Sequence, residues 1–352
     1  MTRRLASHAE PDTASPIPAP PIIAEVTRGG MVESRHRGSL AVVDAKGRVV
    51  EAIGIVDEPI YPRSAIKPLQ AILLVESGAA DRFQVSDSEV TLASASHNGE
   101  PMHVEAVRAW LQRIGLSEND LECGAQLPGY AGVAHELIRS GIAPTALHNN
   151  CSGKHTGFLT VARHLGVPTK GYIEPEHPVQ RLLFKLFEEL CAADLSRRPR
   201  GRDGCGIPVF GITLAEMARA LAQLADPEGL APTRAGACRR IVRSVAANPL
   251  LIAGTGRFDS KVIAGTGGAI LVKGGAEGVH AAALPTQGLG IALKIEDGAG
   301  RASGVALGQA LVHMGAITPE QAQGLASELA APLKNWVGTH VGDIRPAGEP
   351  AF

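Results

Sequence analysis

Ser64 and Lys67 have the residue types and the spacing of a nucleophile and its base. On a helix, residues three apart share one face, so the hydroxyl and the amine can meet. Pro68 is tolerated only in the first turn of a helix, which predicts that Ser64 lies at the helix N-terminus beside unpaired N–H groups. A serine becomes an effective nucleophile when a neighbouring amine accepts its proton. An N-cap serine followed by a solvated lysine is the alternative interpretation.

A second polar cluster, formed by Ser96, His97 and Asn98, lies within the segment 92–100. The pattern predicts a strand end or loop, in which Gly99 permits an unusual backbone turn. Small polar side chains in a tight loop are typical of sites that orient a polar substrate. A capped loop without a ligand explains the pattern equally well, so both interpretations stay open at this point.

A third cluster contains two cysteines. Cys151, Lys154 and His155 precede a helical pattern, and Cys205 lies between two glycines close to Asp203. A thiol near a helix N-terminus and a lysine has a lowered pKa and acts as a nucleophile or a metal ligand. Two cysteines, one nitrogen and a water form acceptable zinc coordination, although a lysine must first lose its proton. The spacing is that of no standard zinc finger, and two buried structural cysteines are the alternative.

The composition argues against several classes of protein. The chain has 352 residues, 45% of them apolar, and a net charge of −1 without long basic or acidic blocks. Nothing therefore indicates a nucleic acid or a membrane surface as a partner, and no apolar run reaches the length of a membrane span. Five dispersed cysteines, an odd number, do not suggest a disulfide framework. A reducing cytoplasm fits this pattern best.

Two parts of the chain differ in character. Residues 1–21 are rich in proline, alanine and polar residues, which predicts a flexible arm rather than a secretory peptide. Residues 22–352 are expected to form one two-lobed domain with a mixed α/β fold. A hairpin is expected at 39–54, helices at 64–76, 101–114, 156–165, 178–192, 214–224, 234–246, 304–314 and 319–329, and further strands at 268–275, 279–284 and 291–295.

Five motifs follow one another along the chain: Ser-Ala-Ile-Lys (64–67), Ser-His-Asn-Gly-Glu (96–100), Asn-Cys-Ser-Gly-Lys-His (150–155), Asp-Gly-Cys-Gly (203–206) and Lys-Gly-Gly-Ala-Glu-Gly (273–278). In this order they resemble the class 3, or rhizobial-type, L-asparaginases, from about residue 22 to the C-terminus. The resemblance implies a fold similar to serine β-lactamases and serine-dependent glutaminases, with an antiparallel sheet flanked by helices and a helical subdomain. It also implies a homodimer that hydrolyses L-asparagine to L-aspartate and ammonia.

The resemblance further implies roles for individual residues. These are two Ser–Lys tandems, one zinc ion with a water as fourth ligand, two residues beside the metal and three candidate substrate contacts. The tandems are Ser64 with Lys67 and Ser96 with Lys273; the zinc ligands are Cys151, Lys154 and Cys205; Asp203 and His155 lie beside the metal; and Arg63, His97 and Asn98 are the candidate substrate contacts. Neither the sequence nor the resemblance decides which serine is acylated, or whether zinc is catalytic or positional.

Two other functions remain open on the sequence. One is a different Ser–Lys amidohydrolase, such as a glutaminase or a penicillin-type acylase, which the Ser64–Lys67 pair and Lys273 fit but the cysteine cluster does not. The other is a non-catalytic, zinc-stabilised binding protein. A comparison of ammonia release from asparagine and glutamine, with β-lactam hydrolysis, separates all three.

Overall fold

A curled antiparallel sheet forms one side of the molecule in the computed structural model, which describes residues 19–348. Its strands follow the order β11-β12-β1-β2-β10-β9-β8, and β3 pairs with β2. The expected flexible arm, residues 1–21, lies almost wholly outside the described residues. The strands of this sheet are β1 (Ile22–Arg28), β2 (Met31–Asp44), β3 (Val49–Ile53), β8 (Leu271–Gly274), β9 (Val279–Leu284), β10 (Leu289–Ile295), β11 (Ala331–Lys334) and β12 (His340–Pro346).

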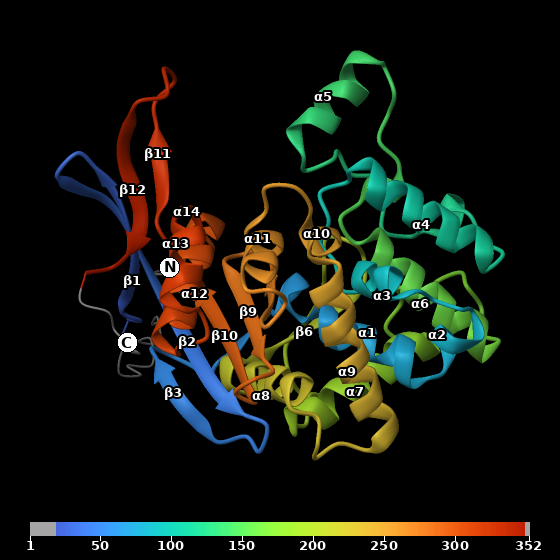
Figure 1. Cartoon of the computed structure of the whole chain (residues 1–352). Helices are drawn as coiled ribbons and strands as arrows, with labels where there is room; N and C mark the ends of the chain where they lie inside the picture. The colour runs from blue at the N-terminus through green and yellow to red at the C-terminus, as the bar shows by residue number, and fades with distance from the viewer. Residues whose placement is uncertain (1–18, 349–352) are drawn as a thin grey trace, which may run out of the picture.

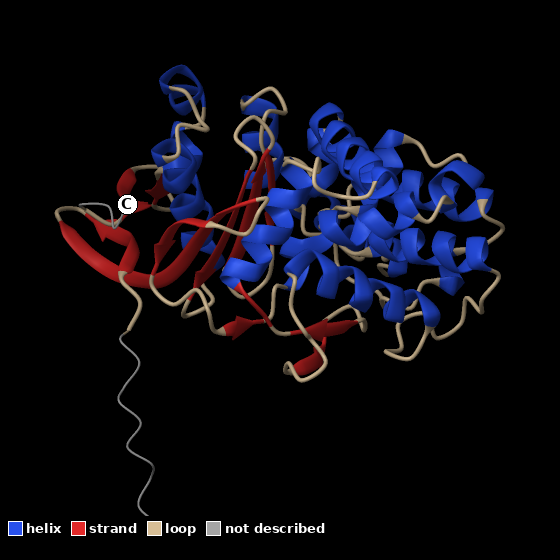
Figure 2. Cartoon of the chain, turned by 90° about the horizontal axis from the view of Figure 1, so that it is seen from below, coloured by secondary structure: helices blue, strands red, loops and turns tan. Residues whose placement is uncertain are grey.

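Most of the helices gather on the other side of the molecule (Figure 2). They form the expected helical part, while α12 lies in front of the strands in Figure 1. Among the helices of residues 19–348, none is both long and apolar enough to cross a membrane. The helices are α1 (Lys67–Glu76), α2 (Ala79–Arg82), α3 (Asp87–Ala93), α4 (Pro101–Arg113), α5 (Ala131–Arg139), α6 (Ser152–Leu165), α7 (Pro178–Cys191), α8 (Leu214–Ala225), α9 (Pro232–Ala247), α10 (Pro249–Ala253), α11 (Phe258–Gly265), α12 (Gly300–His313), α13 (Pro319–Gly324) and α14 (Ala326–Leu329).

The mixed α/β fold with an antiparallel sheet flanked by helices is therefore confirmed. The hairpin of β2 and β3 and the large central helices lie where the apolar periodicity places them. Two short ladders, which the sequence did not indicate, join β4 (Pro59–Ile60) to β7 (Ile212–Thr213) and β5 (Arg200–Arg202) to β6 (Pro208–Phe210). Short 3₁₀ turns cover η1 (Arg63–Ile66), η2 (Glu118–Asp120) and η3 (Ala146–His148).

Three local predictions differ from the structure. The segment 249–259, read as a polar loop, contains α10 and the start of α11. Helix α10 begins with a proline in its first turn, but the polar and glycine-rich residues that follow favoured a loop in the sequence interpretation. The helix expected over 319–329 is two short helices that meet at Leu325. The segment 92–100, expected as a strand end or loop, begins with the last two residues of the helix α3 and continues as a loop, so only the strand end is wrong. Helix α3 begins with a capping box between Ser86 and Glu89.

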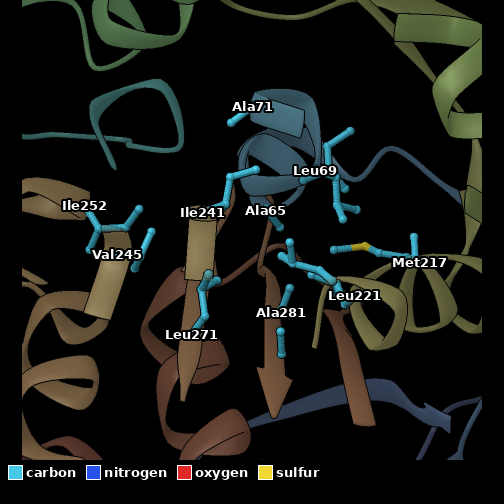
Figure 3. Packing of buried hydrophobic residues seen from close by; sticks show 14 of the residues in the cluster. Ala65, Leu69, Ala71, Met217, Leu221, Ile241, Val245, Ile252, Leu271 and Ala281 are labelled. Atoms are coloured by element: carbon cyan, nitrogen blue, oxygen red, sulfur yellow. The ribbon is translucent and has the colours of Figure 1, made fainter. Parts of the chain in front are cut away.

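The hydrophobic core lies between α1, the sheet and α8. Leu69 of α1 is fully buried, and its side chain lies near Leu221 of α8 and Ala281 of β9 (Figure 3). Gly290 of β10 allows α8 to come close, since a Cβ there would lie 2.0 Å from the carbonyl oxygen of Ala218. Loss of a side chain as large as Leu69 from such a core typically costs about 2–5 kcal/mol. This packing fixes the position of α1 and of the 3₁₀ turn before it.

Candidate active site

The two candidate serines, Ser64 and Ser96, line the same cavity, whose volume is about 460 Å³. A cavity of this size fits a small-molecule site. Ser64 reaches it from η1 and Ser96 from the loop after α3. The cavity is also lined by His97, Asn98, Arg257, Phe258, Asp259, Gly274 and His280.

Lys67 lies at the start of α1 with only 1% of its surface exposed. Its Nζ donates hydrogen bonds to Ala95 O (2.7 Å), Ser96 Oγ (2.9 Å) and Asn150 O (3.3 Å). Burial lowers the pKa of Lys67. A neutral amine here can donate to the two carbonyl oxygens while its lone pair accepts the Ser96 hydroxyl proton. The arrangement therefore suits proton transfer between Ser96 and Lys67.

Within residues 19–348 no hydrogen bond joins Ser64 to Lys67, and the tandem of these two residues stays a prediction. Ser64 does lie at the helix N-terminus, as Pro68 indicated, but it belongs to the 3₁₀ turn η1 rather than to α1 itself. The preceding residue, Arg63, has a φ of 51°. For a residue other than glycine this backbone is strained, and such strain is concentrated at functional sites. Lys67, three residues after Ser64, thus forms its serine hydrogen bond with Ser96.

Lys273, the other candidate base, is buried in β8 with 1% exposure. Its Nζ lies 3.8 Å from Asp259 Oδ2 and donates to Gly274 O at 2.5 Å. The expected pairing with Ser96 is not seen as a hydrogen bond within the described residues. Burial lowers the pKa of Lys273 to about 7, against the opposing effect of the Asp259 charge. Lys273 can therefore change its charge near neutral pH.

Asp259 and His280 form the part of the site that the sequence interpretation missed. His280 Nε2 lies 2.8 Å from Asp259 Oδ1, and the Gly274 N–H donates to Asp259 Oδ2 at 2.8 Å. Burial would raise the pKa of Asp259, but His280, Lys273 and the Gly274 N–H together hold it below its usual range. One signal was available, because His280 is a polar residue in the apolar strand β9. Asp259 thus holds the Gly274 N–H and the His280 ring close to Lys273.

The predicted metal ligands Cys151, Lys154 and Cys205 lie together. Lys154 Nζ donates to Cys205 Sγ at 3.1 Å, and all three residues are at least 95% buried. A hydrogen bond with Cys205 lowers the pKa of Cys151 well below its usual value and raises that of Cys205. Burial alone would lower the pKa of Lys154, but the two cysteines raise it above its usual value. The cluster thus holds thiolate character next to an ammonium.

This donor set fits zinc chemically, since two sulfurs and one nitrogen leave a fourth position for water. Within residues 19–348 no group of three or more His, Cys, Asp or Glu side chains could hold a metal. A site of two cysteines and a lysine contains only two side chains of those four types, and therefore falls outside this description. Asp203 does not bond to the cluster; its Oδ1 accepts from Arg63 Nε at 2.9 Å.

His155 and His97 are buried and neutral. The His155 Nδ1 lies 2.7 Å from the Tyr172 hydroxyl, and burial, with Lys154 and Lys67 nearby, lowers its pKa well below the usual value. The His97 Nε2 lies 2.9 Å from Ser152 Oγ, and its Nδ1 accepts from the Gly99 N–H at 3.2 Å. His97 lines the cavity, but both of its ring nitrogens already have partners.

Asn98 also lines the cavity and supports the loop before α11. Its Nδ2 donates to Thr255 O at 3.4 Å, and its Oδ1 is buried against Gly254. A Cβ on Gly254 would lie 2.1 Å from that oxygen, and the φ of 108° also requires glycine. Asn98 thus holds a segment of the cavity wall in place.

Comparison with known proteins decides the family. A family model described as L-asparaginase II matches residues 24–346. The chain belongs to this family. The predicted asparaginase resemblance is therefore confirmed at the level of the family. No curated protein matches the chain.

Several solved structures show a remote similarity to this family member. Mglu in its native form is 16% identical with a TM-score of 0.38, covering 74% of this chain and 60% of its own. A β-lactamase from Burkholderia ambifaria is 14% identical with a TM-score of 0.39, covering 80% and 94%. Simvastatin synthase from Aspergillus terreus is 14% identical with a TM-score of 0.36, covering 73% and 86%. The chain thus spans three fifths of Mglu.

Proposed function

We propose that this protein is an L-asparaginase, which hydrolyses L-asparagine to L-aspartate and ammonia through serine acylation. The family match over residues 24–346 supports amide hydrolysis. The observation that carries the mechanism is the 2.9 Å hydrogen bond between Lys67 Nζ and Ser96 Oγ beside the cavity. A serine in contact with a buried amine of lowered pKa is an activated nucleophile.

The reaction needs two transfers of the acyl group. In the first, a serine Oγ attacks the side-chain amide carbon, the hydroxyl proton goes to the lysine amine, and the C–N bond breaks as the leaving nitrogen takes a proton. In the second, water attacks the ester, the serine regains its proton, and aspartate leaves. Direct contact favours Ser96 as the serine that Lys67 deprotonates. Ser64 lines the same cavity and is the second candidate.

Lys273 is the second proton carrier in this proposal. Its pKa of about 7 allows it to give or take a proton near neutral pH. The cavity reaches its neighbours Gly274, Asp259 and His280. Protonated Lys273 would also stabilise the negative charge that develops on the carbonyl oxygen.

We further propose a zinc ion held by Cys151, Lys154 and Cys205. When bound, zinc supplies a Lewis acid or a fixed positive charge near the site. Cys205 and Lys154 must lose their protons for binding, since both have raised pKa values in the protein without metal. The homodimer implied by the asparaginase resemblance, and its location in the cytoplasm, belong to the same proposal.

The deciding experiment measures ammonia release from L-asparagine and L-glutamine, with nitrocefin hydrolysis as a third reaction. We expect kcat/KM for asparagine to exceed that for glutamine by about 10–200-fold, the usual discrimination of one methylene. Comparable values for the two amides would point to a glutaminase, and nitrocefin turnover would point to a β-lactam hydrolase. Zinc binding without any turnover would leave a binding protein.

Mass spectrometry of the quenched reaction then identifies the acylated serine. In wild type we expect an adduct on the peptide that contains Ser96. Ser64→Ala should keep this adduct if Ser96 is the nucleophile, whereas an adduct on Ser64 that persists in Ser96→Ala would assign the nucleophile to Ser64. Cys238→Ala is a matched control for the loss of one Oγ or Sγ atom, because Cys238 is buried in α9 and does not line the cavity. Its adduct should be that of wild type.

A further inference from the structure

Arg257 is a cation on the wall of the 460 Å³ cavity that the proposed chemistry does not use. It is exposed and immediately precedes α11. Within residues 19–348, no hydrogen bond or ion pair engages its guanidinium group. The other charged residue on this wall is Asp259. Its two oxygens already serve His280, the Gly274 N–H and Lys273, so Asp259 is not available to neutralise Arg257.

The remaining cations near the site are also occupied. Lys67 makes three hydrogen bonds, and Lys273 is buried beside Asp259. Arg63 Nε donates to Asp203 Oδ1 at 2.9 Å. Arg257 is thus the cation of this cavity, among the described residues, that is free to bind an anionic ligand group.

The loop before Arg257 is held rigidly. Thr255 binds Glu100 twice, through its N–H at 2.8 Å and its hydroxyl at 2.7 Å. Gly254 and Gly256 have φ values of 108° and 76°, which glycine adopts without strain. Gly254 packs directly on Asn98. A loop fixed in this way presents Arg257 at a constant place on the cavity wall, which lowers the entropy lost when a ligand binds.

The helix end beside Arg257 adds to its attraction for an anion, whereas the Asp259 carboxylate on the same wall already has Lys273 as its counter-charge. Helix α11 begins at the next residue, and Phe258 and Asp259 of its first turn line the cavity. The positive end of a helix dipole and its unpaired N–H groups add to the field of a guanidinium. An arginine fork matches a carboxylate with two parallel hydrogen bonds.

We propose that Arg257 binds the α-carboxylate of the amino-acid substrate and thereby selects amides that carry a free α-carboxylate. This inference rests on the proposed function for the identity of the substrate. It assigns one end of the cavity to the α-carboxylate and leaves the side-chain amide to the serines. Arg257 is then a specificity-determining residue, and simple primary amides are poor substrates.

The test compares two β-amides in wild type and Arg257→Met. L-Asparagine carries the α-carboxylate, and 3-aminopropanamide is the same molecule without it. We expect Arg257→Met to lower kcat/KM for asparagine by about 10–150-fold, the usual effect of a hydrogen bond to a charged group. The value for 3-aminopropanamide should change less than about threefold. Arg257→Lys should recover part of the loss, since it keeps the charge but not the fork.

Arg239→Met is the matched control, because it removes an exposed arginine from α9, which does not line the cavity. Equal losses for both amides in Arg257→Met would overturn the inference and leave the asparaginase function standing. Calorimetric binding of L-aspartate against 3-aminopropanoate gives a readout without turnover. If wild type binds aspartate through Arg257 but hydrolyses no asparagine, the inference survives and the proposed function fails. The inference is overturned if wild type and Arg257→Met bind aspartate with equal affinity. It is also overturned if neither protein binds aspartate.

Discussion

Asp259→Asn tests the electrostatic reasoning about the site most directly, because it removes one buried charge and keeps the shape. Asp259 Oδ2 lies 3.8 Å from Lys273 Nζ, and both side chains are at least 93% buried. An asparagine in this place can still accept from the Gly274 N–H and donate to the His280 ring. The fold should therefore survive, while Lys273 loses the neighbour that favours its charged form.

The size of the effect follows from the distance. Two unit charges 3.8 Å apart interact by about 4 kcal/mol at an effective dielectric constant of about 20. One pH unit corresponds to about 1.4 kcal/mol, so the pKa of Lys273 should fall by up to about three units. In wild type this pKa is about 7, since burial lowers it and Asp259 opposes that fall. The variant should keep Lys273 neutral throughout the neutral range.

The assay is the dependence of kcat/KM for L-asparagine on pH. Wild type should show an ionisation near pH 7. In Asp259→Asn the same ionisation should lie at lower pH, whether the active lysine is charged or neutral. Glu296→Gln is the matched control, because this exposed carboxylate does not line the cavity. An active variant whose ionisation stays near pH 7, or moves upward, would refute the assignment to Lys273.

Stability gives a second measurement that needs no activity. The folded pKa of Lys273 lies below that of the unfolded chain, so the unfolded state binds more protons between about pH 7 and 10. This group therefore destabilises the fold increasingly as pH falls through that window, and the effect levels off below pH 7. In Asp259→Asn the destabilisation should continue below pH 7. Urea unfolding at pH 5 and pH 8 measures it, and a constant difference from wild type would contradict the prediction.

Three further outcomes are expected. Lys67→Met and Ser96→Ala should each remove most of kcat, and the double variant should lose little more, because the effects of residues that act as one unit are non-additive. Multiplicative losses in steady-state kinetics would show that Lys67 and Ser96 do not act as a pair. Gly254→Ala should destabilise by at least about 1–3 kcal/mol from its backbone alone, and more than Gly256→Ala, whose Cβ meets no atom within 4 Å; equal melting temperatures would contradict the packing. Elemental analysis should find about one zinc per chain, less in Cys205→Ser, with affinity falling as pH drops because binding must displace protons from a lysine and a cysteine; equal zinc in both proteins would exclude Cys205.

Local patterns were sufficient for the elements of this fold but not for the pairing within the site. Pro68 places the start of α1, and the period of apolar residues places the central helices. The Lys67–Ser96 contact joins residues 29 apart in sequence. It depends on how α1 packs against the loop after α3, which no spacing rule contains. Sequence reasoning therefore paired Lys67 with its near neighbour Ser64.

Asp259 and His280 were missed for the same reason. They lie 21 residues apart and meet only because α11 begins beside the sheet edge where β8 and β9 pair. A buried acid and a buried histidine are ordinary residues until their partner is known. Lys273 could be identified from its motif, whereas the groups that set its pKa could not.

The cysteine cluster and the serine site are joined at two points, which bears on the role of the proposed metal. Asn150, whose carbonyl oxygen accepts from Lys67, directly precedes Cys151. Asp203, which binds Arg63 beside Ser64, lies two residues before Cys205. The two cysteines thus belong to the segments that hold the turn of Ser64 and the amine of Lys67. Because closing the cluster with a metal would restrain both segments, its removal should loosen the serine site and weaken substrate binding more than it lowers the maximal rate.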